Sequence, residues 1–386
     1  MAIVKPFCAI RPTRDKVSLV ASRSYLSYNA ETLIEKLEHN PYTFLHIINP
    51  DYSEQGEEVQ GKAKYPLVKT KFHQFQKEGV FIQDENPHFY LYQQQKGAVI
   101  FTGIICASSV DDYLNGTIKI HEQTIARREE MFKDYLGGTG FNAEPVLLTY
   151  PDHPGVDKIL SQYYDERPEY EFTTTNRSVH KLWLIQKESD VAALQESFAE
   201  AEALYIADGH HRSASSALLC QQKRQENPSY TGAESFNYCM SYLIPESQLR
   251  ILDFNRLVCD LNGLEKDDLL QAISKSYKVT DASQDFSPQG KDEIGMYLNG
   301  QWYSLTAQEG SFNRAHCVEK LDPAILSKNI LSPILGIHDL RTDKRIAFMD
   351  GTLGKEALEK AVDSGSYALA FALKPIDVAQ LKEVAD

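Results

Sequence analysis

The stretch that decides the fold is Ala-Leu-Tyr-Ile-Ala-Asp-Gly-His-His-Arg, residues 203–212. Its first five residues form a short apolar run, which predicts a strand buried on both faces of a sheet. The small side chains that follow predict a helix over residues 213–222 that can lie close to that sheet. A strand that turns at once into a helix points backbone N–H groups and partial positive charge outward, and anions bind there. We therefore expect a phosphate site at residues 208–212.

The side chains of this turn suit an anionic ligand. Gly209 permits close backbone approach and a positive φ, and Arg212 can offer a bidentate fork to phosphate oxygens. Asp208 can cap the helix, bind a ribose hydroxyl or help to hold a metal. His210 and His211 must point in different directions, so one should face the ligand while the other packs. A plain polar surface turn is the alternative, but the apolar strand before it and Arg212 inside the first turn favour function.

A second cluster of chemically active side chains lies upstream, where Lys119, His121 and Glu122 open a charged helix. A carboxylate beside an imidazole and a lysine is suited to taking a proton from a hydroxyl. Arg127 and Arg128, further along, could bind a phosphate or a substrate carboxylate. The alternative is a solvated helix with Glu and Arg paired along its surface.

The length of 386 residues predicts two domains in an α/β protein with mixed sheets. We place the boundary near residue 245, so that residues 1–245 hold the Asp-Gly-His-His-Arg turn. Residues 246–386 then form a C-terminal α/β domain with a β-hairpin at 295–305 and a terminal β-α-β unit. Further strands are expected at 42–48, 89–93, 98–108 and 144–150, and further helices at 121–136 and 188–202.

Composition excludes several classes of protein. The net charge of −14 argues against nucleic acid as the main partner, because coating a phosphate backbone needs many cations. Neither a signal peptide nor an apolar run long enough for a membrane span is found, so we expect a cytoplasmic protein without a membrane partner. The six scattered cysteines lack a C-x-x-C pair, which argues against a disulfide framework or zinc knuckle. The last helix has an apolar face formed by Val378, Leu381 and Val384, which predicts that it packs in the core or at an interface. A homodimer is one arrangement that such an interface would allow.

Several segments together resemble a widespread bacterial family known mainly as a domain of unknown function. The matching segments are residues 40–47 (NPYTFLHI), 109–124 (SVDDYLNGTIKIHEQT), 144–150 (EPVLLTY), 205–212 (YIADGHHR) and 367–375 (YALAFALKP). The strand-to-helix G-x-x-R turn is also similar to the one shared by chromosome-partitioning ParB proteins, sulfiredoxin and free-serine kinases. This resemblance implies a ParB/sulfiredoxin-like nucleotide-binding core.

The resemblance further implies a small-molecule phosphotransferase, most concretely a free-serine-type kinase with a nucleotide or pyrophosphate donor and Mg²⁺. Gly209, His210, His211 and Arg212, together with Lys119, would hold the donor. Glu122, helped by His121 and Asp208, would act on the acceptor hydroxyl, and Arg127 and Arg128 would bind the substrate. Sulfiredoxin chemistry is not expected, because that turn needs a cysteine where this chain has His210 and His211.

Two departures from the family pattern bear on completeness. Relatives often carry Pro-Pro-Tyr-Asp early in the chain, whereas residues 23–26 are Arg-Ser-Tyr-Leu and lack the carboxylate. Relatives also usually continue into a Pro-Lys-Ser-Thr segment after the last strand and helix. This sequence stops at Asp386, so a site residue from that segment is expected to be missing.

Two other functions remain open from the residues. A metal-dependent hydrolase would assign His121, Asp208, His210 and His211 to Zn²⁺ or Mn²⁺, although no HExxH or comparable spacing supports it. A non-catalytic nucleotide-binding protein would use the same turn without Glu122 as a base.

Overall fold

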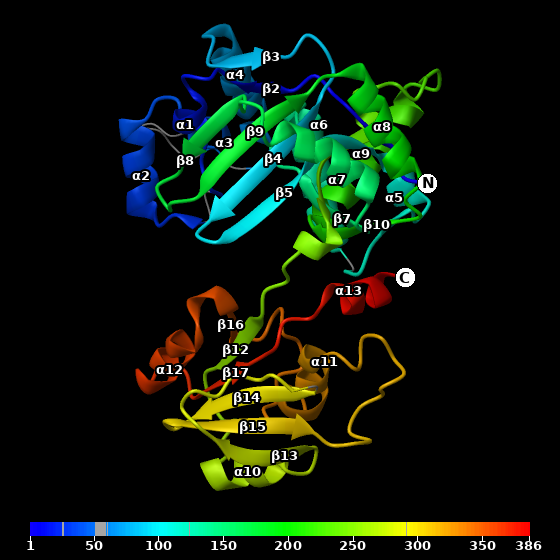
Figure 1. Ribbon diagram of the computed structural model, residues 1–386. Coiled ribbons are helices and arrows are strands. Elements are labelled where there is room, and N and C mark those ends of the chain that lie inside the picture. The colour runs from blue at the N-terminus through cyan, green and yellow to red at the C-terminus, as the bar shows by residue number, and fades with distance from the viewer. Residues whose placement is uncertain (25–26, 51–58, 60, 123, 291) are drawn as a thin grey trace. The chain divides into compact units, whose positions relative to one another are not determined.

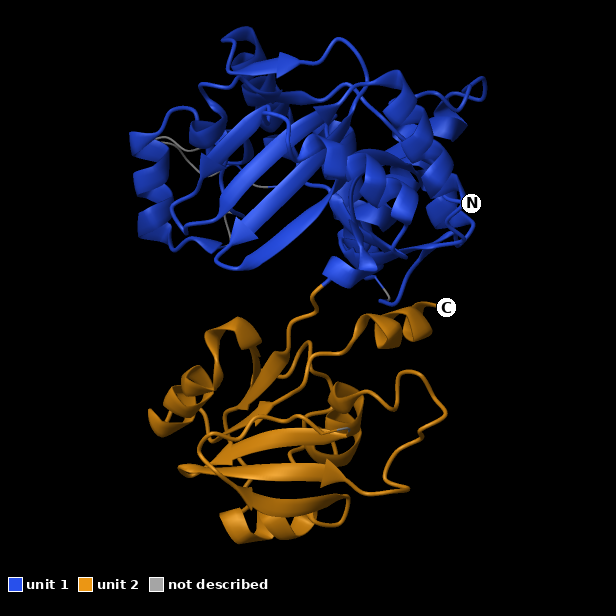
Figure 2. Ribbon diagram, in the orientation of Figure 1, with its two compact units in different colours: residues 1–249 blue, residues 250–386 orange. Residues whose placement is uncertain are grey.

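The computed structural model describes residues 1–24, 27–50, 59, 61–122, 124–290 and 292–386. The chain divides into two compact units, Met1–Leu249 and Arg250–Asp386 (Figure 2). Both units combine helices with sheets, so the predicted α/β class with mixed sheets is confirmed. Within the described ranges, none of the helices has the length and apolar character needed to cross a membrane.

A large mixed sheet forms the centre of the first unit, and Figure 1 shows its longest strands side by side. Its strands are, in spatial order, β6 (Ile118–Lys119), β10 (Leu204–Asp208), β7 (Val146–Tyr150), β11 (Tyr238–Pro245), β5 (Val99–Ser109), β4 (Phe89–Lys96), β9 (Val179–Ile185) and β8 (Tyr170–Thr173), with β1 (Val4–Lys5) also paired to β5. The pairs β6–β10 and β7–β11 are parallel, and the remaining pairs are antiparallel. A small separate sheet joins β2 (Ile10–Pro12) and β3 (Phe81–Gln83).

The helices of the first unit follow the chain in this order: α1 (Val17–Val20), α2 (Ala30–His39), α3 (Leu45–Ile48), α4 (Lys64–Lys77), α5 (Val110–Leu114), α6 (Ala126–Thr139), α7 (Pro154–Tyr163), α8 (Glu188–Ala199) and α9 (His210–Glu226). The main core lies between one face of the large sheet and α7 and α8, where side chains such as Leu160, Phe198 and Ile104 are buried. Burial of these apolar side chains, at about 25 cal/mol per Å², is the driving force for this layer. A second core joins α3, α4 and β3 through Phe72, Phe75 and neighbours.

The second unit is built on one sheet with the order β13 (Tyr277–Ala282), β15 (Gln301–Ala307), β14 (Glu293–Leu298), β17 (Leu369–Ala372), β12 (Phe254–Val258) and β16 (Ile346–Asp350). Its α-helices are α10 (Lys266–Ile273), α11 (Asp322–Leu326), α12 (Lys355–Asp363) and α13 (Val378–Ala385). The predicted hairpin is confirmed as β14–β15, where Asn299 and Gly300 both take positive φ in the turn. The predicted β-α-β unit is confirmed as β16, α12 and β17, whose strands flank β12.

The strand predicted at residues 42–48 is wrong. Leu45–Ile48 form the short helix α3, and Leu45 and Ile47 are fully buried. A short apolar run does not distinguish a buried strand from a buried helical turn by periodicity alone. Here the contact of α3 with α4 decides the outcome in favour of a helix.

The helix predicted at residues 121–136 begins later than expected, at Ala126. The preceding residues follow directly from β6, and Ile125 still has an extended backbone with φ −93° and ψ 116°. His121 and Glu122 therefore lie in a loop at the end of a strand and not on a helix. Neither residue belongs to the first helical turn that the sequence predicted.

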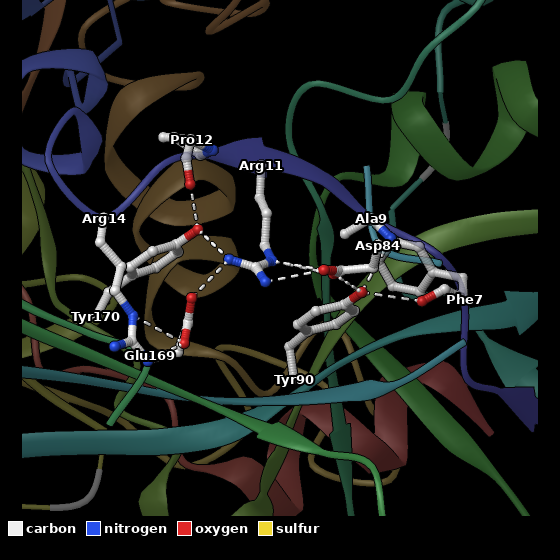
Figure 3. A network of polar contacts seen from close by, with 9 residues as sticks. All are labelled: Phe7, Ala9, Arg11, Pro12, Arg14, Asp84, Tyr90, Glu169 and Tyr170. Atoms are coloured by element: carbon white, nitrogen blue, oxygen red, sulfur yellow. Dashed lines mark hydrogen bonds and ion pairs between the residues drawn. The ribbon is translucent and has the colours of Figure 1, made fainter. Parts of the chain in front are cut away.

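A network of polar side chains ties the small sheet to the large one, and Figure 3 shows its members converging on Arg11. Arg11, on β2, donates to Asp84 at 2.9 Å and to Glu169 at 2.9 Å. Tyr90, on β4, donates to Asp84 at 2.7 Å, and Tyr170, on β8, accepts from Arg11. The side chains of Arg11 and Asp84 are only 13% and 7% exposed. Each charge is therefore buried, and its partner is needed to stabilise it.

We expect Arg11→Met to destabilise the protein by about 3 kcal/mol, because the Asp84 carboxylate would remain buried without its cation. Arg14→Met is the matched control, since Arg14 also pairs with Glu169 but is 57% exposed. Its loss should cost less than about 1 kcal/mol. Urea unfolding of both variants measures the difference, and equal losses would show that the Arg11 network does not hold the two sheets together.

Candidate functional site

The parallel pairing of β6 with β10 joins the two motifs that the sequence presents far apart. The register places Lys119 opposite Tyr205, and both strands end at the same edge of the sheet. The loop with His121 and Glu122 and the turn at 208–210 therefore leave the sheet next to each other.

Gly209 makes the sharp change from strand to helix. Its backbone has φ 97° and ψ 29°, a left-handed conformation that side chains other than glycine rarely adopt. Helix α9 begins at the next residue, and no side chain caps its first turn. The first N–H groups of a helix have no intrahelical partner, so the start of α9 presents donors and partial positive charge.

Three imidazoles surround this helix start. His210 is only 5% exposed, and its ring lies 4.5 Å from that of His121 in an edge-to-face arrangement. The Nδ1 atom of His210 lies 3.5 Å from Oε2 of Glu122, whose side chain is 61% exposed. Among the described residues, His210 Nε2, His121 Nδ1 and His211 Nδ1 are buried without a hydrogen-bond partner. Buried polar atoms are normally paired, so this concentration makes the start of α9 a candidate functional site.

Burial lowers the pKa of His210 to about 4, and the neighbouring His121 adds to the effect. The pKa of His121 is also lowered by burial, although the carboxylate of Glu122 opposes this. Both rings are therefore neutral near pH 7. A neutral imidazole has one N–H donor and one acceptor, so these rings can orient a ligand or Glu122 without competing as cations.

The Arg212 guanidinium folds back over the turn. It donates to the backbone carbonyl of Pro145 at 2.7 Å, lies 3.2 Å from Oε2 of Glu144, and donates to Asp208. A Cβ on Gly209 would lie 3.1 Å from Nε of Arg212, so glycine also makes space for this group. Glu144 and Asp208 are 72% and 69% exposed. A phosphate that binds the guanidinium would compete with these exposed carboxylates for its N–H donors.

Helix α6 packs against α9. Arg128 is exposed and its guanidinium carbon lies 6.0 Å from the centre of the Phe132 ring, which is 6.4 Å from the ring of His211. Arg127 is exposed in the same turn. Cations at a helix N-terminus oppose the helix dipole, so two arginines there suggest an anionic partner.

A small cavity lies beneath the first turn of α9, between that helix and the sheet. Polar groups of Ser108, Ser213, Ser241 and Cys239 line it, together with apolar residues. It has room for about one water molecule and cannot hold a nucleotide. Any ligand of the Asp-Gly-His-His-Arg turn must therefore bind outside this cavity, at the edge of the sheet.

The tertiary structure adds Glu144 and Pro145 to the residues singled out from sequence. The signal was present as a turn before the strand at 144–150, but nothing in the sequence linked it to Arg212.

No group of three or more His, Cys, Asp or Glu side chains able to hold a metal ion is found within the described part of the chain. The metal-dependent hydrolase therefore has no ligand set there. Residues 23–26 are the segment in which the sequence differs from the family pattern. Of these, Tyr25 and Leu26 lie outside the described residues.

The chain belongs to the family described as "Protein of unknown function (DUF1015)", whose model matches residues 4–324. The family membership expected from the sequence is thereby confirmed. No match was found among curated proteins.

Solved structures with low similarity include a conserved hypothetical protein from Pyrococcus furiosus, at 13% identity and a TM-score of 0.34 over 72% of this chain and 83% of that one. A free serine kinase in complex with AMP matches at 12% identity and a TM-score of 0.36, over 73% and 81% of the two chains. SbnI with a C-terminal truncation from Staphylococcus aureus matches at 13% identity and a TM-score of 0.37, over 73% and 76%. At these TM-scores the similarities carry no argument about this chain.

The lowered pKa of His210 predicts a stability that falls with acidification. Between the ordinary pKa of 6.5 and about 4, the unfolded chain binds a proton that the folded protein does not. The free energy of unfolding should therefore drop by on the order of 2 kcal/mol from about pH 7 to about pH 5 through this group. Urea unfolding across this range should show a weaker pH dependence for His210→Gln than for wild type. His39→Gln, which changes an exposed histidine on α2, should keep the wild-type dependence, and an unchanged dependence in His210→Gln would contradict the assignment.

Proposed function

We propose that the first unit is a small-molecule phosphotransferase of the free-serine-kinase type, using a nucleotide or pyrophosphate as donor and Mg²⁺. The observation that carries the proposal is the meeting of the uncapped start of α9 with buried, unpartnered imidazole nitrogens and the exposed carboxylate of Glu122. The acceptor class, a free hydroxy amino acid, comes from the resemblance of the G-x-x-R turn to that superfamily.

The donor phosphates would bind at the start of α9. Backbone N–H groups of the first turn and the partial positive charge of the helix favour negative charge there. Arg212 would add a guanidinium once a phosphate displaces Glu144, and Arg128 lies on the side of α6 that faces His211. These groups would stabilise charge on the transferring phosphoryl group.

Glu122 would act as the general base. Its exposed carboxylate can reach an acceptor, and His210 contacts it from the buried side. The acceptor oxygen would attack the terminal phosphorus of the donor as its proton moves to Glu122, and the bond from that phosphorus to the bridging oxygen would break. His210 is neutral near pH 7, so it contacts Glu122 without forming a charged ion pair.

Mg²⁺ suits the residues at this edge. It usually takes one or two carboxylates together with phosphate oxygens, and it does not need an all-protein cage. Asp208 provides an exposed carboxylate beside the helix start. When bound with the donor, the ion would supply positive charge to the phosphate oxygens.

Glu122→Gln should reduce turnover by about 10²-fold or more, because an amide cannot accept the acceptor's proton. Affinity for the donor should persist, since the amide has nearly the same shape. Product formation from free serine and calorimetric titration with ADP and pyrophosphate measure the two effects. Glu130→Gln is the control, because Glu130 is exposed on α6 and pairs with Lys133, which is not a residue of the helix start.

Loss of donor binding in Glu122→Gln would contradict its role as a base. A wild-type protein that binds the donor but forms no product with any hydroxy acceptor would instead favour the non-catalytic nucleotide-binding protein.

Glu144→Gln should strengthen pyrophosphate binding, because it removes a carboxylate that competes for Arg212. Exposed ion pairs contribute at most about 1 kcal/mol, so the gain should not exceed about fivefold. Calorimetric titration checks this value against wild type and Glu130→Gln. Weaker binding in Glu144→Gln would show that Arg212 does not take part in holding the phosphate.

A further inference from the structure

Strand β16 is an edge strand of the sheet in the second unit, and Figure 1 shows β16 and β13 at the two ends of that sheet. It pairs with β12 on one side, and within the described part of this unit no strand pairs with its other side. Edge strands usually carry charged residues or proline that prevent pairing with another chain. Strand β13 follows this rule with the exposed side chains of Lys278 and Asp281. Strand β16 has the sequence Ile-Ala-Phe-Met-Asp, in which the only charge is at the last residue.

The backbone groups of β16 alternate between β12 and the open edge. Arg345, just before the strand, accepts a hydrogen bond from the N–H of Cys259, and Gly351, just after it, donates to the carbonyl of Asp253. Both pairs continue the register of β16 with β12, which has no shift. Every second residue between them therefore also bonds to β12. The N–H and C=O groups of the central residue, Phe348, consequently point to the open edge.

The side chains along this edge are apolar and exposed. Phe348 is 40% exposed, and its ring stacks on that of Phe254 with centroids 5.4 Å apart and an angle of 21° between the planes. Arg256, opposite Phe348 on β12, places its guanidinium carbon 4.5 Å from the centre of the Phe348 ring, which helps to fix the ring. Phe254 is 52% exposed, and Leu353, shortly after the strand, is 61% exposed. Apolar side chains grouped at an open strand edge favour an interface.

The charges of this edge suit a second copy of the same strand. Lys344 and Arg345 precede β16, and Asp350 ends it. When two copies pair antiparallel about Phe348, the basic end of each strand lies beside the acidic end of the other. The two Phe348 rings are then directly opposite, and Ile346 is opposite the second copy's Asp350. Lys344 is diagonal to that Asp350, a separation that a long side chain can span.

We propose that β16 is the interface of a homodimer in which two copies of the chain pair edge to edge, antiparallel, and join their sheets into one. Two-fold symmetry is the commonest arrangement of homo-oligomers, and it uses the same surface on both subunits. The pairing gives the outward N–H and C=O groups of Phe348 hydrogen-bond partners and covers the exposed aromatic rings. The interface belongs to the second unit and does not depend on the proposed function of the first.

Phe348→Lys should convert the dimer to a monomer, because two like charges would be opposite each other at the centre of the interface. Phe348→Pro should do the same, since the only backbone donor it removes faces the open edge, a position where a strand tolerates proline. Thr280→Lys is the matched control: it places the same charge at an exposed position of β13, the opposite edge, and should leave the dimer intact. Analytical ultracentrifugation of the full chain over a concentration series measures the result, after thermal unfolding confirms that each variant is folded.

A charge exchange between copies distinguishes this pairing from any other interface. Lys344→Glu and Asp350→Lys should each weaken the dimer by about fivefold or more, because like charges then meet at both ends of the paired strands. A mixture of the two variants should associate as tightly as wild type, since opposite charges meet again at both ends. A wild type that stays monomeric throughout the series, a dimer that survives both Phe348 variants, or no recovery in the mixture would overturn the proposal.

Discussion

Parallel pairing between β6 and β10 is the constraint on which the candidate site depends. Parallel strands end at the same edge of a sheet, so the pairing brings the loop with His121 and Glu122 to the turn at Gly209. These segments are more than eighty residues apart in the sequence. Without that pairing the carboxylate and the uncapped helix start would belong to separate surfaces, and neither would form a site alone.

The two arginine networks differ in how far their acidic partners are exposed. Arg11 is buried and satisfied by Asp84 and Glu169, an arrangement that suits a structural connection between sheets. Arg212 is paired with Asp208 and Glu144, whose carboxylates remain largely exposed. An exposed ion pair contributes little free energy, so a phosphate can replace one of its members at small cost. The second network is therefore suited to exchange of partners, and the first is not.

The imidazoles next to Arg212 add a different physical element. Burial keeps the rings of His210 and His121 neutral, and the unpartnered nitrogens of His210, His121 and His211 retain hydrogen-bonding capacity that the protein leaves unused among its described residues. Leaving such groups unpaired in a folded protein costs free energy. A ligand that supplies the missing partners recovers that free energy on binding, which couples occupancy of the site to the stability of the helix start.

Local sequence by itself determined the strand and helix around Gly209, the hairpin at Asn299–Gly300 and the likeness to the family. These features depend on neighbouring residues: apolar run length, glycine's access to positive φ and turn chemistry. Only the tertiary structure decided that residues 45–48 are helical and that Glu144 pairs with Arg212. Each of those outcomes depends on strand order and packing between distant segments, which no local pattern of residues encodes.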